Sequence, residues 1–271
     1  MRLTKHQGLG NDFLVLLDVD GTQTVTPELA RAACDRHLGI GADGLLHVTA
    51  GGDGADVTMA LFNADGSRAE MSGNGVRCLG QAVLQAGLVP GPRLRVATDA
   101  GLRTLEILPS DRADTHLVTV DMGPVDDRGD AAEWMGAGVV AAGWASMGNP
   151  HLVLYAPDPD SAPDVVELGP VVNARTPGGA NVHVVALGSS DDELVLQVYE
   201  RGVGPTLACG TGACAAAAVA HRWGLVGGDV RVHMPGGTAH VTLTERTILL
   251  GGPTTSVALI ELPWPVPGTT A

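Results

Sequence analysis

Two short stretches decide the fold of this chain, Met71-Ser72-Gly73-Asn74-Gly75-Val76 and Ala208-Cys209-Gly210-Thr211-Gly212-Ala213. Each places a small hydroxyl or thiol side chain directly before a Gly-x-Gly turn. Each turn opens a run of small and apolar residues, which predicts helices over 76–86 and 213–223. A glycine follows each run and suits the end of a helix. The same local design therefore occurs twice.

The two stretches belong to an internal repeat, in which Ser72 matches Cys209 at an offset of 137 residues. Other matches follow in the same order at an offset of 137 or 138: 10–16 with 148–154, 41–43 with 179–181, 62–63 with 199–200, and 87–88 with 224–225. Glycine and alanine are abundant here, so the shared order and offset carry the argument. The chain is predicted to contain two copies of one fold.

The divide falls between 109 and 124, where Pro, Asp and Gly accumulate. We expect an N-terminal half over 1–115, a C-terminal half over 116–257, and a segment over 258–271 that returns to the first half. A further helix is expected over 27–37, with Thr26 as its N-cap. Strands are expected at 14–17, 45–48, 57–62, 94–97 and 102–108, and at 152–155, 182–187, 194–199, 230–234 and 239–243. The Pro-rich tail from 263 is expected to be loosely held.

Composition excludes several classes of protein. The net charge is −14, and no run of Lys and Arg could neutralise phosphates, so no nucleic-acid partner is expected. The longest small-apolar stretch, 213–220, is too short to cross a membrane, and no signal peptide precedes the first strand-like segment. These features favour a cytoplasmic protein with no membrane partner.

Residues for cofactor or metal chemistry are scarce. The four cysteines, Cys34, Cys78, Cys209 and Cys214, form no Cys-x-x-Cys pair, so we expect reduced thiols and no metal site. Lys5 is the only lysine, and no phosphate-binding motif surrounds it. Pyridoxal phosphate needs a lysine for its Schiff base. Carbanion chemistry in this chain is therefore expected to use no cofactor.

The two turns nevertheless suit acid–base chemistry. A helix N-terminus offers free N–H groups and a positive dipole end, which can hold a carboxylate. There, Cys209 is expected to have a pKa below its usual value of about 8.5 and to act as a base. Inverting a stereocentre requires one group to remove a proton and another to return one to the opposite face. Ser72 and Cys209 are the two candidates.

A dinucleotide-binding site is the alternative interpretation of the glycines. Both 39–44 and 210–215 fit Gly-x-Gly-x-x-Gly/Ala, and Asp229 lies nearly 20 residues beyond the second. The motif at 39–44 follows a predicted helix rather than a strand. The motif at 210–215 lies ten residues past its strand, and no βαβ series surrounds it. This alternative, an NAD-linked oxidoreductase, ranks last.

Eight blocks of the sequence resemble diaminopimelate epimerases, in the order of that family. They are 5–13 (KHQGLGNDF), 35–44 (DRHLGIGADG), 62–67 (FNADGS), 71–78 (MSGNGVRC), 147–151 (MGNPH), 199–202 (YERG), 208–214 (ACGTGAC) and 234–237 (MPGG).

The resemblance implies an α/β (α+β) fold of two pseudo-symmetric domains. Each is a curled, mostly antiparallel sheet around a central helix, with the active site in the cleft between the domains. It also implies interconversion of LL- and meso-2,6-diaminopimelate for lysine and peptidoglycan synthesis, without pyridoxal phosphate or metal, by a homodimer.

The same resemblance assigns roles to residues. The catalytic set is Ser72, Cys209, His151 and Glu200, of which the last two tune the protonation of the acid–base pair. The substrate-binding set is Asn11, Asn63, Gly73, Asn74, Asn149, Asn181, Glu200, Arg201, Gly210 and Thr211. Arg201 suits a carboxylate, and the Asn and Glu oxygens suit ammonium groups.

The sequence departs from the family at its first catalytic cysteine, which is Ser72 here. A hydroxyl is a much weaker acid than a thiol and needs a neighbouring base. Gly44 also stands where the family tends to have Gln. Three hypotheses follow, in order: a slower epimerase in which Ser72 relays protons, a relative with altered chemistry such as a hydroxy-amino-acid dehydratase or another racemase, and a form that binds substrate but hardly turns it over.

Overall fold

The computed structural model describes residues 1–158 and 160–262, and in it the chain forms two compact units. Unit 1 comprises the chain up to Val120 together with the segment from Gly252, and unit 2 comprises Asp121–Gly251. The sequence-based division at 115 and 257 stays a prediction for independently folding domains. The tail expected to be loosely held, from 263 on, lies outside the described residues.

Each unit contains two helices and a series of strands. Unit 1 holds β1 (Arg2–Gly8), β2 (Asn11–Leu17), α1 (Pro27–Cys34), β3 (Gly44–Ala50), β4 (Val57–Asn63), β5 (Arg68–Ala69), α2 (Gly73–Gln85), β6 (Arg93–Thr98), β7 (Gly101–Pro109) and most of β8 (Thr115–Asp121). Unit 2 holds β9 (Asp126–Asp130), η1 (Ala132–Trp134), β10 (Ala141–Ser146), β11 (Pro150–Tyr155), α3 (Val165–Arg175), β12 (Asn181–Leu187), β13 (Glu193–Glu200), β14 (Gly204–Pro205), α4 (Gly210–Arg222), β15 (Asp229–Met234) and β16 (Gly237–Leu243). The long strand β17 (Ile248–Glu261) pairs with β16 in unit 2 and with β1 in unit 1.

The strand pairings confirm the internal repeat. In unit 1, β2 pairs parallel with β3, β3 antiparallel with β4, and β6 antiparallel with β7. In unit 2, β11 pairs parallel with β12, β12 antiparallel with β13, and β15 antiparallel with β16. A helix joins the parallel strands in both units, as α1 and α3. The predicted α+β fold, dominated by antiparallel pairs, is therefore confirmed.

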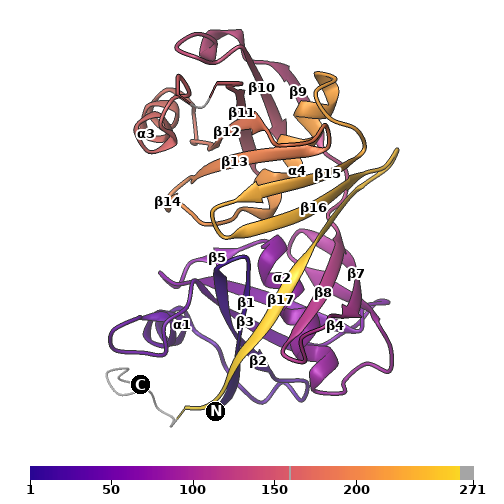
Figure 1. Ribbon diagram of the computed structural model, residues 1–271. Helices are drawn as coiled ribbons and strands as arrows, with labels where there is room; N and C mark the ends of the chain where they lie inside the picture. The colour runs from indigo at the N-terminus through magenta and orange to yellow at the C-terminus, as the bar shows by residue number, and fades with distance from the viewer. Residues whose placement is uncertain (159, 263–271) are drawn as a thin grey trace. The chain divides into compact units, whose positions relative to one another are not determined.

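A central helix fills the curled sheet of each unit, α2 in unit 1 and α4 in unit 2 (Figure 1). Both are buried along nearly their whole length. A helix that is apolar on all sides needs neighbours on all sides, and α4 packs against β10, β11, β12, β13, β15 and β16. The small side chains of Ala213–Ala220 allow this close packing. None of the helices in the described chain has the length and apolar character needed to cross a membrane.

Several element predictions differ from the structure at their ends. The two central helices begin three residues earlier than predicted, at Gly73 and Gly210, because Ser72 and Cys209 act as their N-caps. The first helix ends at Cys34 rather than at 37, since Asp35 leaves helical geometry. The supposed linker 109–124 contains β8, whose polar residues alternate with buried Val118 and Val120.

Helix α3 was not predicted, because Gly169 and Pro170 interrupt its pattern. The structure shows why glycine is needed there. A Cβ built on Gly169 would lie 2.2 Å from Cγ of Tyr199, whose ring packs on the core of unit 2. The helix approaches β13 closely enough that only a hydrogen atom fits between them.

We predict that Gly169→Ala destabilises unit 2 although alanine favours helices. Alanine gains about 1 kcal/mol in helix propensity, but overpacking a core typically costs about 1–3 kcal/mol. Thermal and urea unfolding should show a lower midpoint. The matched control is Val171→Ala, on an exposed position of the same helix, which should be neutral or slightly stabilising. A Gly169→Ala protein at least as stable as Val171→Ala would contradict this packing argument.

Candidate functional site

Ser72 caps the first turn of α2. Its backbone is extended, and its Oγ accepts a hydrogen bond from the Gly75 N–H at 3.0 Å. Among the described residues, no titratable side chain has a hydrogen bond to this hydroxyl. The N–H groups of Gly73 and Asn74, at the start of the helix, likewise have no partner in the described chain. The turn can therefore hold an anion, but its hydroxyl has no adjacent base.

Asn11 and Asn74 are fixed by a chain of hydrogen bonds. The fully buried Arg77 donates to Asn74 Oδ1 at 2.6 Å, and Asn74 Nδ2 donates to Asn11 Oδ1 at 3.3 Å. Asn11 Nδ2 in turn donates to Asp43 Oδ2 at 2.6 Å. Both ends of each amide are thus occupied within unit 1. These two residues shape the Ser72 turn more than they offer free groups to a ligand.

An ion-pair network holds Asp43, the last residue of this series of hydrogen bonds, in place. Arg36 bridges the carboxylates of Asp12 and Asp43 at 2.7 Å each, and Lys5 pairs with Asp12 at 2.8 Å. Burial would raise the pKa of Asp12, but hydrogen bonds and charge from Arg36 and Lys5 hold it below its ordinary value. Lys5 also donates to the Gly41 carbonyl. The only lysine of the chain therefore has a structural partner.

Asn63 presents a free oxygen, because its Nδ2 donates to Ser67 Oγ at 3.0 Å while its Oδ1 has no partner in the described chain. Gly44 faces Asn63 across the β3–β4 pair. The register also corrects the repeat: Leu14 pairs with Leu45 as Leu152 pairs with Val182, so Gly44 rather than Asp43 corresponds to Asn181. A Cβ at Gly44 would lie 2.8 Å from the Phe62 carbonyl oxygen. A larger side chain is excluded there by backbone contact.

Cys209 caps α4 as Ser72 caps α2. Its Sγ accepts from the Gly212 N–H at 3.3 Å and lies 3.5 Å from Thr211 Oγ1. The N–H groups of Gly210 and Thr211 have no partner in the described chain. Cys209 is 5% exposed, and its thiol lies beside the carboxylate of Glu200.

The pKa of Cys209 is raised well above its ordinary value, which corrects the expectation of a lowered one. Burial is the largest cause, and the negative charge of Glu200 acts in the same direction. The hydrogen bonds from Thr211 and Gly212 lower the pKa, as the helix N-terminus predicts, but they are outweighed. The thiol is therefore protonated in this state, with Glu200 placed to receive its proton.

Glu200 is the last residue of strand β13, Arg201 follows it, and the two side chains have different partners. Thr206 Oγ1 donates to Glu200 Oε1 at 2.7 Å, which fixes the carboxylate beside the thiol. The exposed Arg201 donates from its guanidinium to the Gly178 carbonyl, and its backbone N–H donates to Asn181 Oδ1. Asn181 Nδ2 points to the Pro150 carbonyl at 3.4 Å, so this amide also serves mainly to hold the strands.

His151 is buried beneath Asn149, whose Oδ1 lies 2.9 Å from His151 Nε2. Burial is the largest cause that lowers the pKa of His151, and the charge of Arg201 adds to it. The second nitrogen of His151 contacts His183, which lies on β12 and is fully buried. The ring is therefore neutral and enclosed.

The structure thus gathers the predicted residues into two clusters, each within one unit. The Ser72 cluster contains Asn11, Asn63, Ser72, Gly73 and Asn74. The Cys209 cluster contains Asn149, His151, Asn181, Glu200, Arg201, Cys209, Gly210 and Thr211. Sequence reasoning missed three supporting residues, Asp43, Arg77 and His183. Asp43 and Arg77 lie within the blocks 35–44 and 71–78 that resemble the family, whereas His183 lies in none of the eight blocks.

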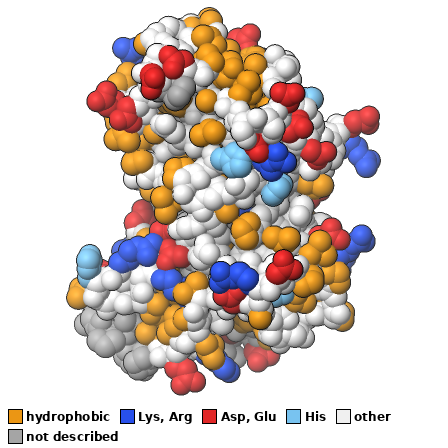
Figure 2. Space-filling model, in the orientation of Figure 1, with side chains coloured by type: hydrophobic (Ala, Val, Ile, Leu, Met, Phe, Trp, Pro, Cys, Tyr) orange, Lys and Arg blue, Asp and Glu red, His pale blue; other side chains and the backbone are white. Residues whose placement is uncertain are grey.

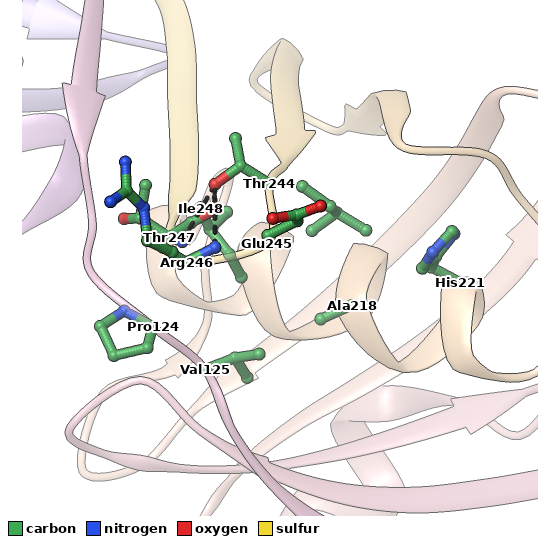
Figure 3. Close-up of a pocket in the computed structure, with 10 residues that line it drawn as sticks. Pro124, Val125, Ala218, His221, Thr244, Glu245, Arg246, Thr247 and Ile248 are labelled. Carbon is green, nitrogen blue, oxygen red and sulfur yellow. Dashed lines mark hydrogen bonds between the residues drawn. The ribbon is translucent and has the colours of Figure 1, made fainter.

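The described residues contain no group of three His, Cys, Asp or Glu side chains that could hold a metal ion. A surface pocket of about 240 Å³ lies elsewhere in unit 2, between the far part of α4 and the turn Thr244–Thr247 (Figure 3). It is lined by His221 and Arg246, and includes none of the predicted site residues. In the face shown in Figure 2, acidic and basic side chains are interspersed with apolar ones, without a continuous basic surface.

Solved structures with the same fold share little sequence with this chain. A PhzF-family phenazine biosynthesis protein from Bacillus anthracis superposes with a TM-score of 0.74 at 17% identity, over 97% of this chain and 98% of its own. A hydroxyproline epimerase from Agrobacterium vitis, with bound trans-4-hydroxy-L-proline, gives 0.70 at 17% identity, over 96% of this chain and 90% of its own. At this identity the likeness establishes the fold alone.

Sequence relatives are closer. A diaminopimelate epimerase from Heliobacterium modesticaldum is 39% identical, over 97% of this chain and all of its own length. One from Leptospira biflexa is 34% identical, over 95% of this chain and 97% of its own. The sequence profile of diaminopimelate epimerase matches residues 3–126 and 143–255. The chain belongs to the diaminopimelate epimerase family.

Proposed function

We propose that this chain is a diaminopimelate epimerase that interconverts the LL and meso isomers without pyridoxal phosphate or metal, and thereby supplies lysine and peptidoglycan precursors. The observation that carries the proposal is the Cys209 cluster. It combines a thiol, a carboxylate in contact with that thiol, and a helix N-terminus with free N–H groups. Family membership supports the choice of substrate.

The first proton transfer begins with the thiol. The carboxylate of Glu200 takes the S–H proton, and the thiolate then removes the proton from Cα of the substrate. The C–H bond breaks, its electron pair stays on the substrate, and an S–H bond forms. The substrate carboxylate accepts hydrogen bonds from the Gly210 and Thr211 N–H groups, which stabilise the charge that develops next to it. A diamino diacid also needs an acceptor for its ammonium groups, and Asn63 Oδ1 is free for that role.

The second proton transfer falls to Ser72, and it limits the reaction. A hydroxyl can donate a proton to a carbanion, but it is a poor base for the reverse direction, and no titratable residue is bonded to it in the described chain. The reaction should therefore be asymmetric. The isomer whose Cα–H faces Cys209 should exchange its proton faster than the other isomer.

We predict that deuterium from D₂O enters the Cα of one diaminopimelate isomer faster than it enters the other. Ser72→Cys should raise the rate of inversion, roughly 10²-fold or more, because general acid–base catalysis is typically worth 10²–10⁴-fold. Cys209→Ala should abolish exchange of the isomer that exchanges faster in the parent protein. Mass spectrometry measures the exchange, and chiral chromatography measures the inversion.

The control for these variants is Cys214→Ala, which removes another buried thiol from the same helix. Equal exchange of the two isomers would overturn the asymmetric role of Ser72. If Ser72→Cys gains nothing and the parent chain eliminates a leaving group from a hydroxylated amino acid, the chain is a dehydratase. That reaction needs only one proton removal, which the Cys209 cluster alone can perform. Binding of diaminopimelate without exchange in any variant would leave a binding protein.

We predict that Glu200→Gln increases the reactivity of Cys209 with iodoacetamide while it reduces epimerisation. Removing the carboxylate charge lowers the pKa of the thiol, so its thiolate fraction at a given pH should rise roughly tenfold for each unit of pKa lowered. The reactivity should increase with pH in both proteins, with the curve of the variant displaced to lower pH. Peptide mass mapping measures the modification at each cysteine.

Cys34 and Cys78 serve as internal references, because burial raises the pKa of each to about 12. The matched control is Glu167→Gln, an exposed glutamate on α3. Unchanged alkylation of Cys209 in Glu200→Gln would show that Glu200 does not govern its protonation.

We further propose that the protein is a cytoplasmic homodimer. The four free cysteines support a reducing compartment. Exposed apolar side chains on three strands of unit 1 support dimerisation: Leu108 and Leu117 pair across β7 and β8, and Val257 and Leu259 lie on β17. Covering such exposed apolar side chains with a second copy of the protein would be favourable.

We predict that Leu117→Glu shifts the protein from dimer to monomer in size-exclusion chromatography with light scattering, because a carboxylate cannot be buried unpaired in the interface. Leu187→Glu, at a similarly exposed apolar position of unit 2, is the matched control. A parent protein that is monomeric throughout the concentration range would refute the dimer.

A further inference from the structure

Three polar side chains of unit 2 form an uninterrupted chain: Asn149, His151 and His183. His151 Nε2 lies 2.9 Å from Asn149 Oδ1, and His151 Nδ1 lies 2.8 Å from His183 Nε2. Both imidazoles are completely buried, and their rings stack with centroids 5.1 Å apart. The remaining nitrogen, His183 Nδ1, has no hydrogen-bond partner in the described chain.

The acceptor atoms in this series of three hydrogen-bonded side chains determine where each proton lies. A carbonyl oxygen only accepts, so His151 Nε2 must carry the hydrogen that it donates to Asn149. A neutral imidazole carries one such hydrogen, so His151 Nδ1 is an acceptor and His183 Nε2 donates to it. His183 Nδ1 is then a bare nitrogen, which agrees with the lack of an acceptor near it. Burial favours the neutral state of both rings, and lowers the pKa of His183 to about 3.

The ring of His183 also packs directly against Gly212, in the turn that holds Cys209. A Cβ on Gly212 would lie 2.3 Å from His183 Cε1 and 2.9 Å from its Nε2. The Gly212 N–H is the group that donates to Cys209 Sγ. Gly212 is therefore required by the ring beneath it, and the ring cannot rotate without displacing the first turn of α4.

The Asn149 amide forms the end of this hydrogen-bonded series opposite His183. With Oδ1 of Asn149 engaged by His151, its Nδ2 is the end that remains, and it has no partner in the described chain. An amide NH₂ donates, so it suits a carboxylate oxygen and not an ammonium group.

We propose that His183 is a positioning residue, which fixes His151 in its Nε2–H tautomer and thereby turns the Asn149 amide so that its NH₂ is presented to a substrate carboxylate. The assignment of the carboxylate rests on the proposed function. The ordering of the three side chains does not, because it follows from their hydrogen bonds alone.

The test compares two replacements of His183. His183→Leu removes the donor but keeps apolar bulk, whereas His183→Gln retains an amide donor that can reach His151 Nδ1. We expect His183→Leu to raise KM for diaminopimelate and lower kcat/KM roughly ten- to hundredfold, as the loss of a supporting hydrogen bond to a functional residue typically does, while His183→Gln restores most of the affinity. His240→Leu, an exposed histidine of the same unit, is the matched control.

The second readout is the ¹⁵N NMR spectrum of histidine-labelled protein, with His151 assigned from a His151→Gln sample. The parent should show His151 as a neutral Nε2–H tautomer across neutral pH, His183→Gln should preserve it, and His183→Leu should lose it. An Nδ1–H or charged His151 in the parent would overturn the proposal. So would KM losses in both variants that merely follow their loss in melting temperature. If the parent turns over no diaminopimelate, the proposed function fails while the tautomer result still stands or falls separately.

Discussion

The hydrogen bond from the Gly212 N–H to Cys209 Sγ is the interaction on which the rest of the Cys209 cluster depends. It makes one sulfur atom both the cap of α4 and the candidate acid–base group. Because α4 is enclosed by strands on all sides, the sheet fixes the helix and the helix fixes the sulfur. Ser72 is held in the same way by Gly75 at the start of α2. The repeat thus preserves the position of an atom, while the chemistry of that atom differs between the copies.

The helix N-terminus lowers the pKa of the Cys209 thiol and burial raises it, and the relative size of these two effects decides its protonation. A helix N-terminus contributes about 0.3–1 kcal/mol, which is less than one unit of pKa at about 1.4 kcal/mol per unit. Burial of an ionisable group can shift its pKa by roughly 3–5 units. Burial therefore prevails at Cys209, and the charge of Glu200 reinforces it. A thiol that is protonated at rest but touches a carboxylate can be deprotonated at the moment of reaction.

The asparagines of the two clusters divide into supporting and presenting groups. Asn11, Asn74 and Asn181 have both ends of their amides engaged by protein atoms. Asn63 offers an oxygen, and Asn149 offers an NH₂ because His151 holds its oxygen. The two amides therefore present opposite hydrogen-bonding ends, an acceptor in unit 1 and a donor in unit 2. The distinction depends on which atom each amide gives to its neighbours, so it is invisible in the sequence.

The sequence by itself determined the internal repeat, the two central helices with their Gly-x-Gly starts, and the departure at Ser72. These features are local or periodic, and they survive as patterns of glycine and alanine. It could not show α3, whose Gly169 and Pro170 break the helical pattern and whose glycine is required by the close approach of Tyr199. It also gave the wrong sign for the pKa of Cys209 and no role for His183. Burial, the contact with Glu200 and the contact between two imidazoles join residues distant in the chain, and only the tertiary structure decided them.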